Sequence, residues 1–296
     1  MKKVRVIYIA GHGRSGSTIL GDVLGSAVNT VHLGEVSHIY PHGIRDNALC
    51  GCGTSFYDCE RWSMVSSQVP RWVFSELKKV DQIANNKDIL FGRINDKDRY
   101  ISALKKLYGI VSDKFEDEII IDSSKAPWYL ALLTQVAVID LFVVHLVRNP
   151  MGTCFSWKKE MSRDDAGSHM KRMDTLSNSR RWISCNIALR KLCSKKSWPY
   201  SMVRYEDFAS APREVVHRLL DSLGLDIDIP FIDASTVRLG TSHSVWGNPK
   251  RLREGVTEIR SDEAWKKHLS FRDKCITGAL CGPLMFHYGY LGFGNK

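Results

Sequence analysis

The stretch from Val4 to Thr18 reads VRVIYIAGHGRSGST, and it decides the fold class. Its first part, Val4–Ala10, is mostly apolar and β-branched, which predicts a buried strand. Gly11–Gly16 is rich in glycine, which favours a tight loop. Residues 17–27 then carry apolar side chains at helical spacing, at Ile19, Leu20, Val23 and Leu24. A strand, a glycine-rich loop and a helix in this order open an α/β domain.

The same alternation of strands and helices continues along the chain. Further strands are predicted at 30–33, 119–122, 141–147 and 200–205. Helices are predicted at 61–116 with an interruption near 85–86, at 127–136, from Pro150, at 170–196, from Pro212 to about Gly224, and at about 262–269 and 272–287. Residues 36–60 are predicted to form a loop, and 226–260 lack clear periodicity. We therefore predict a parallel β-sheet flanked by helices, in a single domain over 1–296 with a helical insertion at about 36–118.

Composition and charge limit the classes of partner. The 296 residues include 44% hydrophobic and 25% charged residues, which is ordinary for a globular protein. The net charge of +10 favours an anionic partner, but no run of basic residues indicates nucleic-acid binding. The most apolar region, 130–147, is interrupted by Gln135, Asp140 and His145, so no membrane span is expected. Without a signal-like N-terminus we expect a cytoplasmic protein whose eight cysteines are reduced.

The loop Gly11–Thr18, GHGRSGST, has the features of an anion site. Its glycines let successive N–H groups face one anion, and the start of the following helix adds partial positive charge. The spacing nearly matches the nucleoside-triphosphate loop G-x-x-x-x-G-K-[ST], but Ser17 occupies the lysine position. The missing lysine argues against ATP or GTP as the ligand. Arg14 supplies a cation three positions earlier instead.

This loop resembles the 5′-phosphosulfate loop of sulfotransferases that use 3′-phosphoadenosine-5′-phosphosulfate (PAPS), in the bacterial and protein-tyrosine-like branch. The resemblance implies a fold of the P-loop nucleotide-binding type. It also implies PAPS as co-substrate and 3′-phosphoadenosine-5′-phosphate (PAP) as product. The cofactor-binding residues implied in this loop are Gly13, Arg14, Ser15, Gly16, Ser17 and Thr18.

Three later segments resemble other motifs of the same family. His145–Pro150, HLVRNP, followed by Ser156 resembles the 3′-phosphate motif, which implies phosphate contacts from Arg148 and Ser156. Tyr205 lies in VRYEDF, which resembles a segment near the adenine. The stretch 247–255, GNPKRLREG, resembles a loop that closes over the nucleotide and implies roles for Arg253 and Gly255. Glu254 replaces the family's lysine there, and Arg251 is a candidate substitute for that cation.

Two residues are expected to carry the chemistry. Glu35 follows the strand at 30–33 and resembles the general base of this branch. Lys125 follows the strand at 119–122 and resembles the lysine that contacts the transferring sulfuryl group, where Arg14 assists it. His12, His32 and His38 are weaker candidates for the base, and Asp122 is a candidate for positioning Lys125 or the acceptor. The expected acceptor is a small molecule with a hydroxyl or an amine, recognised by the insertion at 36–118.

The reaction is expected to need no metal, because Arg14, Lys125 and backbone amides supply the positive charge. Cys50, Cys52 and Cys59 nevertheless offer three soft ligands, and His42 could complete a zinc set of four. A reduced, packed cluster is the favoured interpretation, and a Cys52–Cys59 disulfide is a further alternative.

Two other functions remain open from the sequence. A P-loop kinase is one, because Ile119–Asp122 also resembles a magnesium-binding strand end. A non-catalytic nucleotide-binding module is the other, and the presence of both Glu35 and Lys125 disfavours it.

Overall fold

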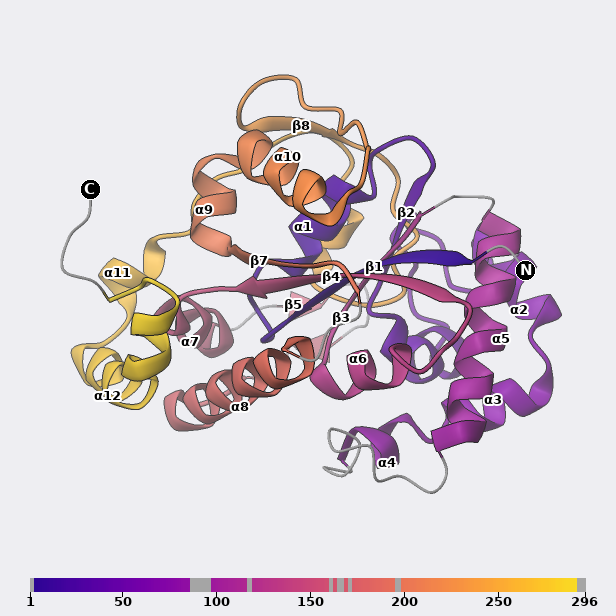
Figure 1. Ribbon diagram of the computed structural model, residues 1–296, viewed down its shortest axis with the longest axis horizontal. Helices are drawn as coiled ribbons and strands as arrows, with labels where there is room; N and C mark the ends of the chain where they lie inside the picture. Colours follow the sequence, from indigo (N-terminus) through magenta and orange to yellow (C-terminus); the bar gives the residue numbers. More distant parts are fainter. Residues whose placement is uncertain are drawn as a thin grey trace.

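The structure, a computed structural model, describes residues 3–85, 97–115, 119–159, 162–163, 168–169, 172–194 and 198–291. Its centre is a five-stranded sheet in the order β2-β3-β1-β4-β7, in which every neighbouring pair is parallel. The strands are β1 (Val4–Gly11), β2 (Thr30–Gly34), β3 (Ile119–Lys125), β4 (Ile139–Val147) and β7 (Tyr200–Arg204). The predicted parallel sheet with flanking helices is therefore confirmed (Figure 1).

Helices cover both faces of this sheet, as Figure 1 shows with the sheet nearly edge-on. One face carries α1 (Ser17–Leu24), α9 (Tyr205–Ser210) and α10 (Pro212–Leu223), and the other carries α5 (Lys97–Phe115), α6 (Pro127–Leu133) and α8 (Thr175–Cys193). Strand side chains alternate between the faces, so Val6 and Tyr8 enter one hydrophobic cluster while Ile7 and Ile9 enter the other. Burial on both faces explains why the strand sequences are continuously apolar.

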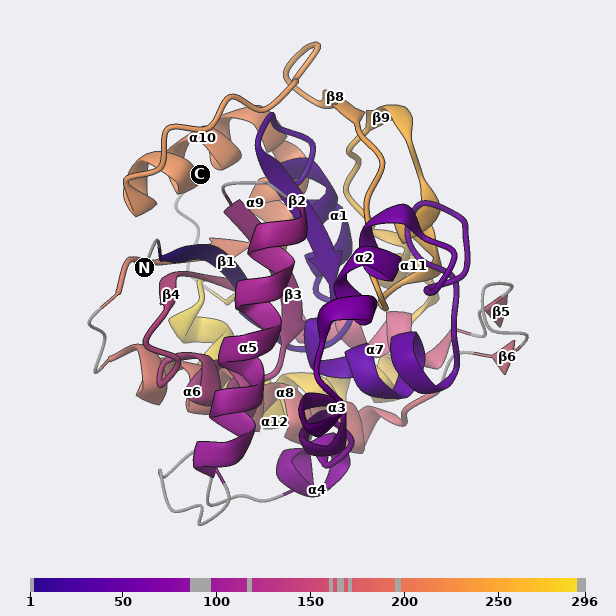
Figure 2. The same cartoon turned by 90° about the vertical axis from the view of Figure 1, so that its right-hand side faces the viewer.

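The segment after β2 is largely helical. It contains a 3₁₀ turn, η1 (Val36–His38), and a π-helical segment, η2 (Ile39–Arg45), so the predicted loop over 36–60 was wrong at its start. It continues with α2 (Glu60–Gln68), α3 (Arg71–Leu77) and α4 (Val80–Asn85). Figure 2 shows α2, α3 and α5 along one side of the molecule, where they pack onto the cluster that contains Tyr8.

The remaining elements pack mainly against the flanking helices and against one another. They are α7 (Pro150–Lys158), β5 (Ser162–Arg163), β6 (Ser168–His169), β8 (Thr236–Leu239), η4 (Pro249–Leu252), β9 (Gly255–Glu258), α11 (Ala264–His268) and α12 (Phe271–His287). The antiparallel pair β8–β9 was not predicted, because strands of four residues are too short to show a pattern. Among the residues that the structure describes, no helix has the length and apolar character needed to cross a membrane.

The strand register brings the predicted site residues to one edge of the sheet. Gly11 at the end of β1 pairs with Leu146, Ala10 pairs with Lys125, and Val147 pairs with Arg204. The carboxyl ends of these parallel strands therefore lie side by side, as expected for the ligand-binding edge of such a sheet.

Candidate active site

The glycine-rich loop is tightly packed against two aromatic rings. Gly16 caps α1 with φ +90°, and a Cβ atom at this position would lie 2.5 Å from Cδ2 of Tyr205. A Cβ atom at Gly13 would lie 2.7 Å from Cζ2 of Trp157, whose indole N–H donates to the Gly13 carbonyl over 3.3 Å. Only glycine fits at both positions. Ser17 and Thr18 follow in the first turn of α1, so the predicted anion loop has the expected strand–loop–helix setting.

Arg148 joins this loop to the end of β4. Its guanidinium is almost fully buried and donates from Nη1 to the carbonyl oxygen of Arg14 over 3.0 Å. Nη2 donates to Oδ2 of Asp262 over 3.1 Å, and the Tyr205 ring centroid lies 4.4 Å from Cζ. The two predicted anion-binding cations, Arg14 and Arg148, therefore belong to adjoining parts of one site.

Within the described part of the chain, two buried polar atoms of this site have no hydrogen-bond partner. They are Oγ of Ser15 in the loop and Nε of Arg148. Buried polar groups are normally paired, so each of these atoms leaves bonding capacity for a ligand. One lies in each of the two predicted anion sites, which fits a ligand that carries two separate anionic groups.

Ser156 lies on α7 one helical turn after Gly152. A Cβ atom at Gly152 would lie 3.1 Å from Nε of Arg148, so this face of α7 looks toward the guanidinium. No measured contact joins Ser156 to Arg148, and its phosphate contact stays a prediction.

The late loop supplies further positive charge. Arg253 is exposed directly after η4, and Gly255 begins β9 with φ +83°. Lys250 was not singled out in the sequence. Desolvation and the charge of Arg253 lower its pKa, the charge of Asp262 opposes this, and the charges of Lys159 and Arg148 lower the pKa further. Lys250 therefore lies among other cations, where an anionic ligand would be favoured.

Arg251 is not the substitute cation that the sequence suggested. It is buried, and its guanidinium donates to the carbonyl oxygens of Ser244 and Leu49. This arginine therefore fastens the loop to neighbouring backbone through Nη1 and Nη2.

Glu35 and Lys125 come together as a close ion pair. Nζ of Lys125 lies 2.6 Å from Oε1 of Glu35, and about one sixth of each side chain is exposed. The Glu35 amide donates to the Trp246 carbonyl over 3.1 Å. A Cβ atom at Gly247 would lie 3.6 Å from Oγ1 of Thr18 and 3.7 Å from Oε1 of Glu35, so the carboxylate adjoins the start of α1.

Asp122 is fully engaged in structural hydrogen bonds. Its Oδ1 accepts from the amide and hydroxyl of Ser124, and its Oδ2 accepts from the Tyr108 hydroxyl. Burial raises its pKa, against these bonds. A carboxylate so enclosed does not match the magnesium ligand of a kinase, whereas its bonds to Ser124 hold the turn that carries Lys125.

The three histidines considered as weaker candidates have other partners. Burial lowers the pKa of His12 to about 4, and its Nε2 is bonded to Oδ1 of Asn178. His32 is buried between Asp22 and Ser123. His38 lies next to Glu35, with its Nδ1 3.7 Å from Oε2 of the carboxylate. Only His38 of the three adjoins the candidate base.

The cysteine-rich segment agrees with the favoured prediction in one respect and departs from the sequence analysis in another. All eight cysteines are free thiols, as the reduced cluster requires, so the alternative of a Cys52–Cys59 disulfide is not supported. His42 does not join the cysteines, because its ring stacks on Trp246 with 3.4 Å between centroids. His243, a residue that the sequence analysis did not single out, takes that place. No local signal points to it, since it lies in a loop about 190 residues away.

Two solved structures share the fold of this chain over nearly its whole length. Their sequence identities to it are too low to show anything beyond the fold. The "Sulfotransferase Domain from the Curacin Biosynthetic Pathway" is 16% identical and has a TM-score of 0.51, with 96% of this chain and 98% of that chain covered. The "Sulfotransferase Domain from the Synechococcus PCC 7002 Olefin Synthase" is 17% identical and has a TM-score of 0.54, with 99% and 97% covered.

The sequence comparisons also match proteins described as sulfotransferases. "Carbohydrate sulfotransferase 3" of Rattus norvegicus and of Mus musculus are each 25% identical over 179 residues, which is 55% of this chain. The match spans only 36% of the length of those curated relatives. The model described as "Sulfotransferase family" matches residues 6–229, a range that includes the glycine-rich loop, Glu35, Lys125 and Arg148. Because that range is most of the chain, the protein belongs to the sulfotransferase family.

Proposed function

We propose that this chain transfers a sulfuryl group from PAPS to a hydroxyl or an amine of a small-molecule acceptor. The observation that carries the proposal is the 3.0 Å bond from Arg148 to the carbonyl of Arg14, which joins two anion sites at one sheet edge. PAPS carries a 5′-phosphosulfate and a 3′-phosphate, and a ligand with anions at both ends of a ribose suits that arrangement.

The two anion sites divide the nucleotide between them. Gly13, Arg14, Ser15, Gly16, Ser17 and Thr18 bind the 5′-phosphosulfate through backbone amides, hydroxyls and the guanidinium. Arg148, Ser156 and Arg253 bind the 3′-phosphate, with Lys250 as an additional cation. Tyr205 packs between Gly16 and Arg148 next to the nucleoside, and Gly255 lets the late loop turn. The unpaired atoms of Ser15 and Arg148 support this assignment.

Glu35 and Lys125 perform the transfer. The Glu35 carboxylate takes the proton from the acceptor hydroxyl or amine as the acceptor atom bonds to sulfur. The bond from sulfur to the bridging phosphate oxygen breaks, and its electron pair leaves on PAP. Lys125 and Arg14 stabilise the charge that grows on that oxygen. The ion pair holds the proposed base 2.6 Å from the proposed cation, so both groups can reach the same reacting centre.

Arg14 and Lys125, the two cations proposed to act in the transfer, have an unusual backbone conformation. Among the residues that the structure describes, four that are not glycine have positive φ: Arg14, Asn29, Asn47 and Lys125. Asparagine tolerates this region, whereas arginine and lysine have no such preference. Residues held in sparsely populated conformations cluster at functional sites, at a cost of about 1–3 kcal/mol each. The φ of +66° at both Arg14 and Lys125 therefore supports their assignment to the reaction.

The segment at about 36–118 is the proposed acceptor-binding part of a single domain. It begins directly after Glu35, so an acceptor bound against it adjoins the base. The names of the rat and mouse relatives make carbohydrate hydroxyls one class to test. Eight free thiols support the expected cytoplasmic location, because that compartment keeps thiols reduced.

Acceptor-dependent release of PAP tests the proposal. The protein is incubated with PAPS and a panel of carbohydrates, phenols and amines, and both PAP and the sulfated product are measured by mass spectrometry. We expect turnover without added magnesium, reduced about 10²- to 10³-fold in Lys125→Ala and unchanged in the exposed control Lys106→Ala. Binding of PAP without turnover on any acceptor would indicate a binding module. Phosphate transfer from ATP that requires magnesium would indicate a kinase.

A further inference from the structure

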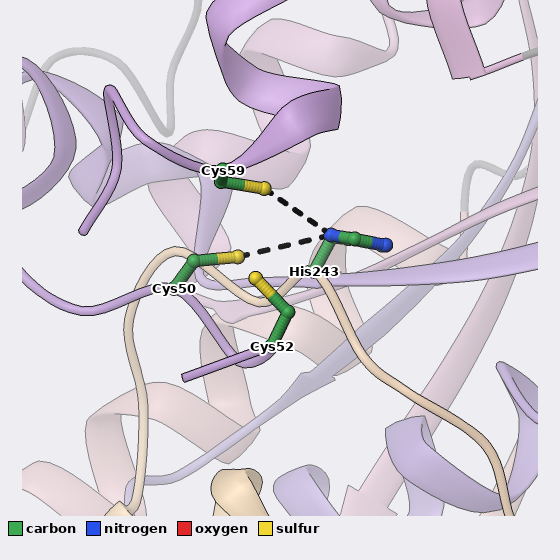
Figure 3. Close-up of side chains that lie close together, drawn as sticks. All are labelled: Cys50, Cys52, Cys59 and His243. Carbon is green, nitrogen blue, oxygen red and sulfur yellow. Dashed lines mark hydrogen bonds between the residues drawn. The ribbon is translucent and has the colours of Figure 1, made fainter. Parts of the chain in front are cut away.

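A cluster of four potential metal ligands lies outside the proposed active site. Cys50, Cys52, Cys59 and His243 each direct one ligand atom to a common centre, and all these atoms lie within 4.8 Å of one another (Figure 3). Nδ1 of His243 is 3.3 Å from Sγ of Cys59 and 3.9 Å from Sγ of Cys50. We call these four residues the Cys–His cluster.

The distances match the edges of a tetrahedral zinc site. Zinc binds sulfur at about 2.3 Å and imidazole nitrogen at about 2.0–2.1 Å, so ideal tetrahedral angles put sulfur and nitrogen ligands about 3.5 Å apart. The two measured distances lie on either side of that value. Three thiols and one imidazole are also a ligand set typical of structural zinc, with no position left for a substrate.

The local backbone holds the cysteines in this arrangement. The amide of Gly53 donates to the Cys50 carbonyl over 2.9 Å, and Gly53 has φ +87°, which glycine tolerates. This turn puts the sulfur atoms of Cys50 and Cys52 on the same side, as Figure 3 shows. Cys59 adds a third sulfur from the N-cap of α2.

The loop that carries His243 packs directly on the turn. The Gly51 amide donates to the Ser244 carbonyl over 2.9 Å, and the Trp62 indole donates to the His243 carbonyl over 2.7 Å. A Cβ atom at Gly51 would clash with Oγ of Ser242. Contacts this close hold the imidazole next to the three sulfurs.

We propose that the Cys–His cluster binds one structural Zn²⁺ ion. Binding displaces the protons of the three thiols, and the lone pair of the His243 Nδ1 atom completes the tetrahedron. The ion fastens the segment that opens the 36–118 region to the loop 242–247. That loop continues to the Trp246 carbonyl, which accepts from the Glu35 amide. The zinc therefore supports the position of the candidate base from a distance and takes no part in the transfer.

Metal analysis of the full chain tests the proposal without any assay of activity. Protein from a zinc-replete culture is exhaustively dialysed, and its zinc is measured by mass spectrometry. We expect one zinc ion per chain, lost in Cys59→Ser and in His243→Ala. The matched controls Cys275→Ser and His217→Ala, at exposed positions, keep it. Wild-type protein at background zinc content, or unchanged zinc in both ligand variants, would overturn the proposal.

A second measurement avoids variants that fail to fold. The wild-type protein is stripped with a chelator and titrated with Co²⁺. We expect intense visible bands of tetrahedral cobalt and a thiolate-to-cobalt charge-transfer band, both saturating at one equivalent and abolished by Zn²⁺. Weak bands typical of octahedral cobalt, or no saturation, would contradict a site built of three thiolates and an imidazole. Neither result depends on whether the chain transfers sulfuryl groups.

Discussion

The strand-end site and the Cys–His cluster are assembled by different means. The strand-end site consists of Arg14, Glu35, Lys125 and Arg148, each at or just after the end of a strand. The parallel sheet brings the ends of those strands to one edge. The cluster joins a cysteine-rich turn to a histidine 184 residues beyond Cys59, through contact between two irregular loops. Ligand sites commonly form at the carboxyl ends of parallel strands, and this rule predicts that the residues of the strand-end site lie together. No comparable rule predicts the contact between the two loops of the Cys–His cluster. The two regions also differ in role, because one is proposed to carry chemistry and the other to hold the structure.

The largest effect on turnover should come from replacing the carboxylate of Glu35 with an amide. Glu35→Gln keeps the shape of the side chain and removes the base, so kcat should fall about 10²- to 10⁴-fold. The affinity for PAP should stay nearly unchanged, and the melting temperature should fall somewhat, because the lost ion pair is mostly buried and Lys125 loses its partner. Steady-state kinetics, calorimetry and thermal unfolding measure the three quantities. Glu60→Gln, an exposed change in α2, is the matched control.

Cys59→Ser should affect stability more than turnover, which is the opposite of the effect expected for Glu35→Gln. A structural ligand contributes to folding, so this variant should melt at a lower temperature and lose its response to chelators. If Glu35→Gln destabilised the fold while retaining wild-type turnover, the division between chemical and structural regions would fail.

Acid should weaken the sheet through a buried histidine. Burial lowers the pKa of His145 in β4 to about 4, against an ordinary value near 6.5. The unfolded chain then binds more protons than the folded one between these values, so stability is full above about pH 6.5 and falls toward pH 4. For this one group the loss at pH 5 is about 2 kcal/mol.

Urea unfolding of the wild type and of His145→Gln measures this contribution. The variant should lose less stability than the wild type between pH 7 and pH 5, while any loss of zinc affects both proteins alike. Parallel pH profiles would show that His145 is not held neutral in the folded protein.

The smallest effect should come from Ser15. Its hydroxyl is buried and unpaired, so Ser15→Ala removes nothing that stabilises the free protein. The same change removes one donor to the 5′-phosphosulfate and should weaken PAP binding roughly three- to tenfold. Calorimetry and thermal unfolding test both expectations, with Ser184→Ala in α8 as the exposed control. A clear loss of stability with intact PAP affinity would assign Ser15 to the fold alone.

Local patterns predicted the sheet and the positions of Arg14, Glu35, Lys125 and Arg148. Apolar runs mark the strands, and the parallel sheet then determines where their ends meet. The same reasoning failed for Arg251, whose charge suggested a phosphate contact although loop packing buries it against backbone carbonyls. It also named His42 as a fourth ligand and did not consider His243, which is distant along the chain. Lys250 was missed as well, because its surroundings depend in part on Lys159 and Arg148 from other segments.

Calorimetry with PAP and 5′-AMP tests the central claim most directly, because these ligands differ only in the 3′-phosphate. The wild type should bind PAP about 10- to 100-fold more tightly than AMP, the range expected for hydrogen bonds to a charged group. Arg148→Ala should bring the two affinities close together, and Arg148→Lys should restore part of the difference. Equal affinity of the wild-type protein for PAP and AMP would contradict a second anion site at the end of β4.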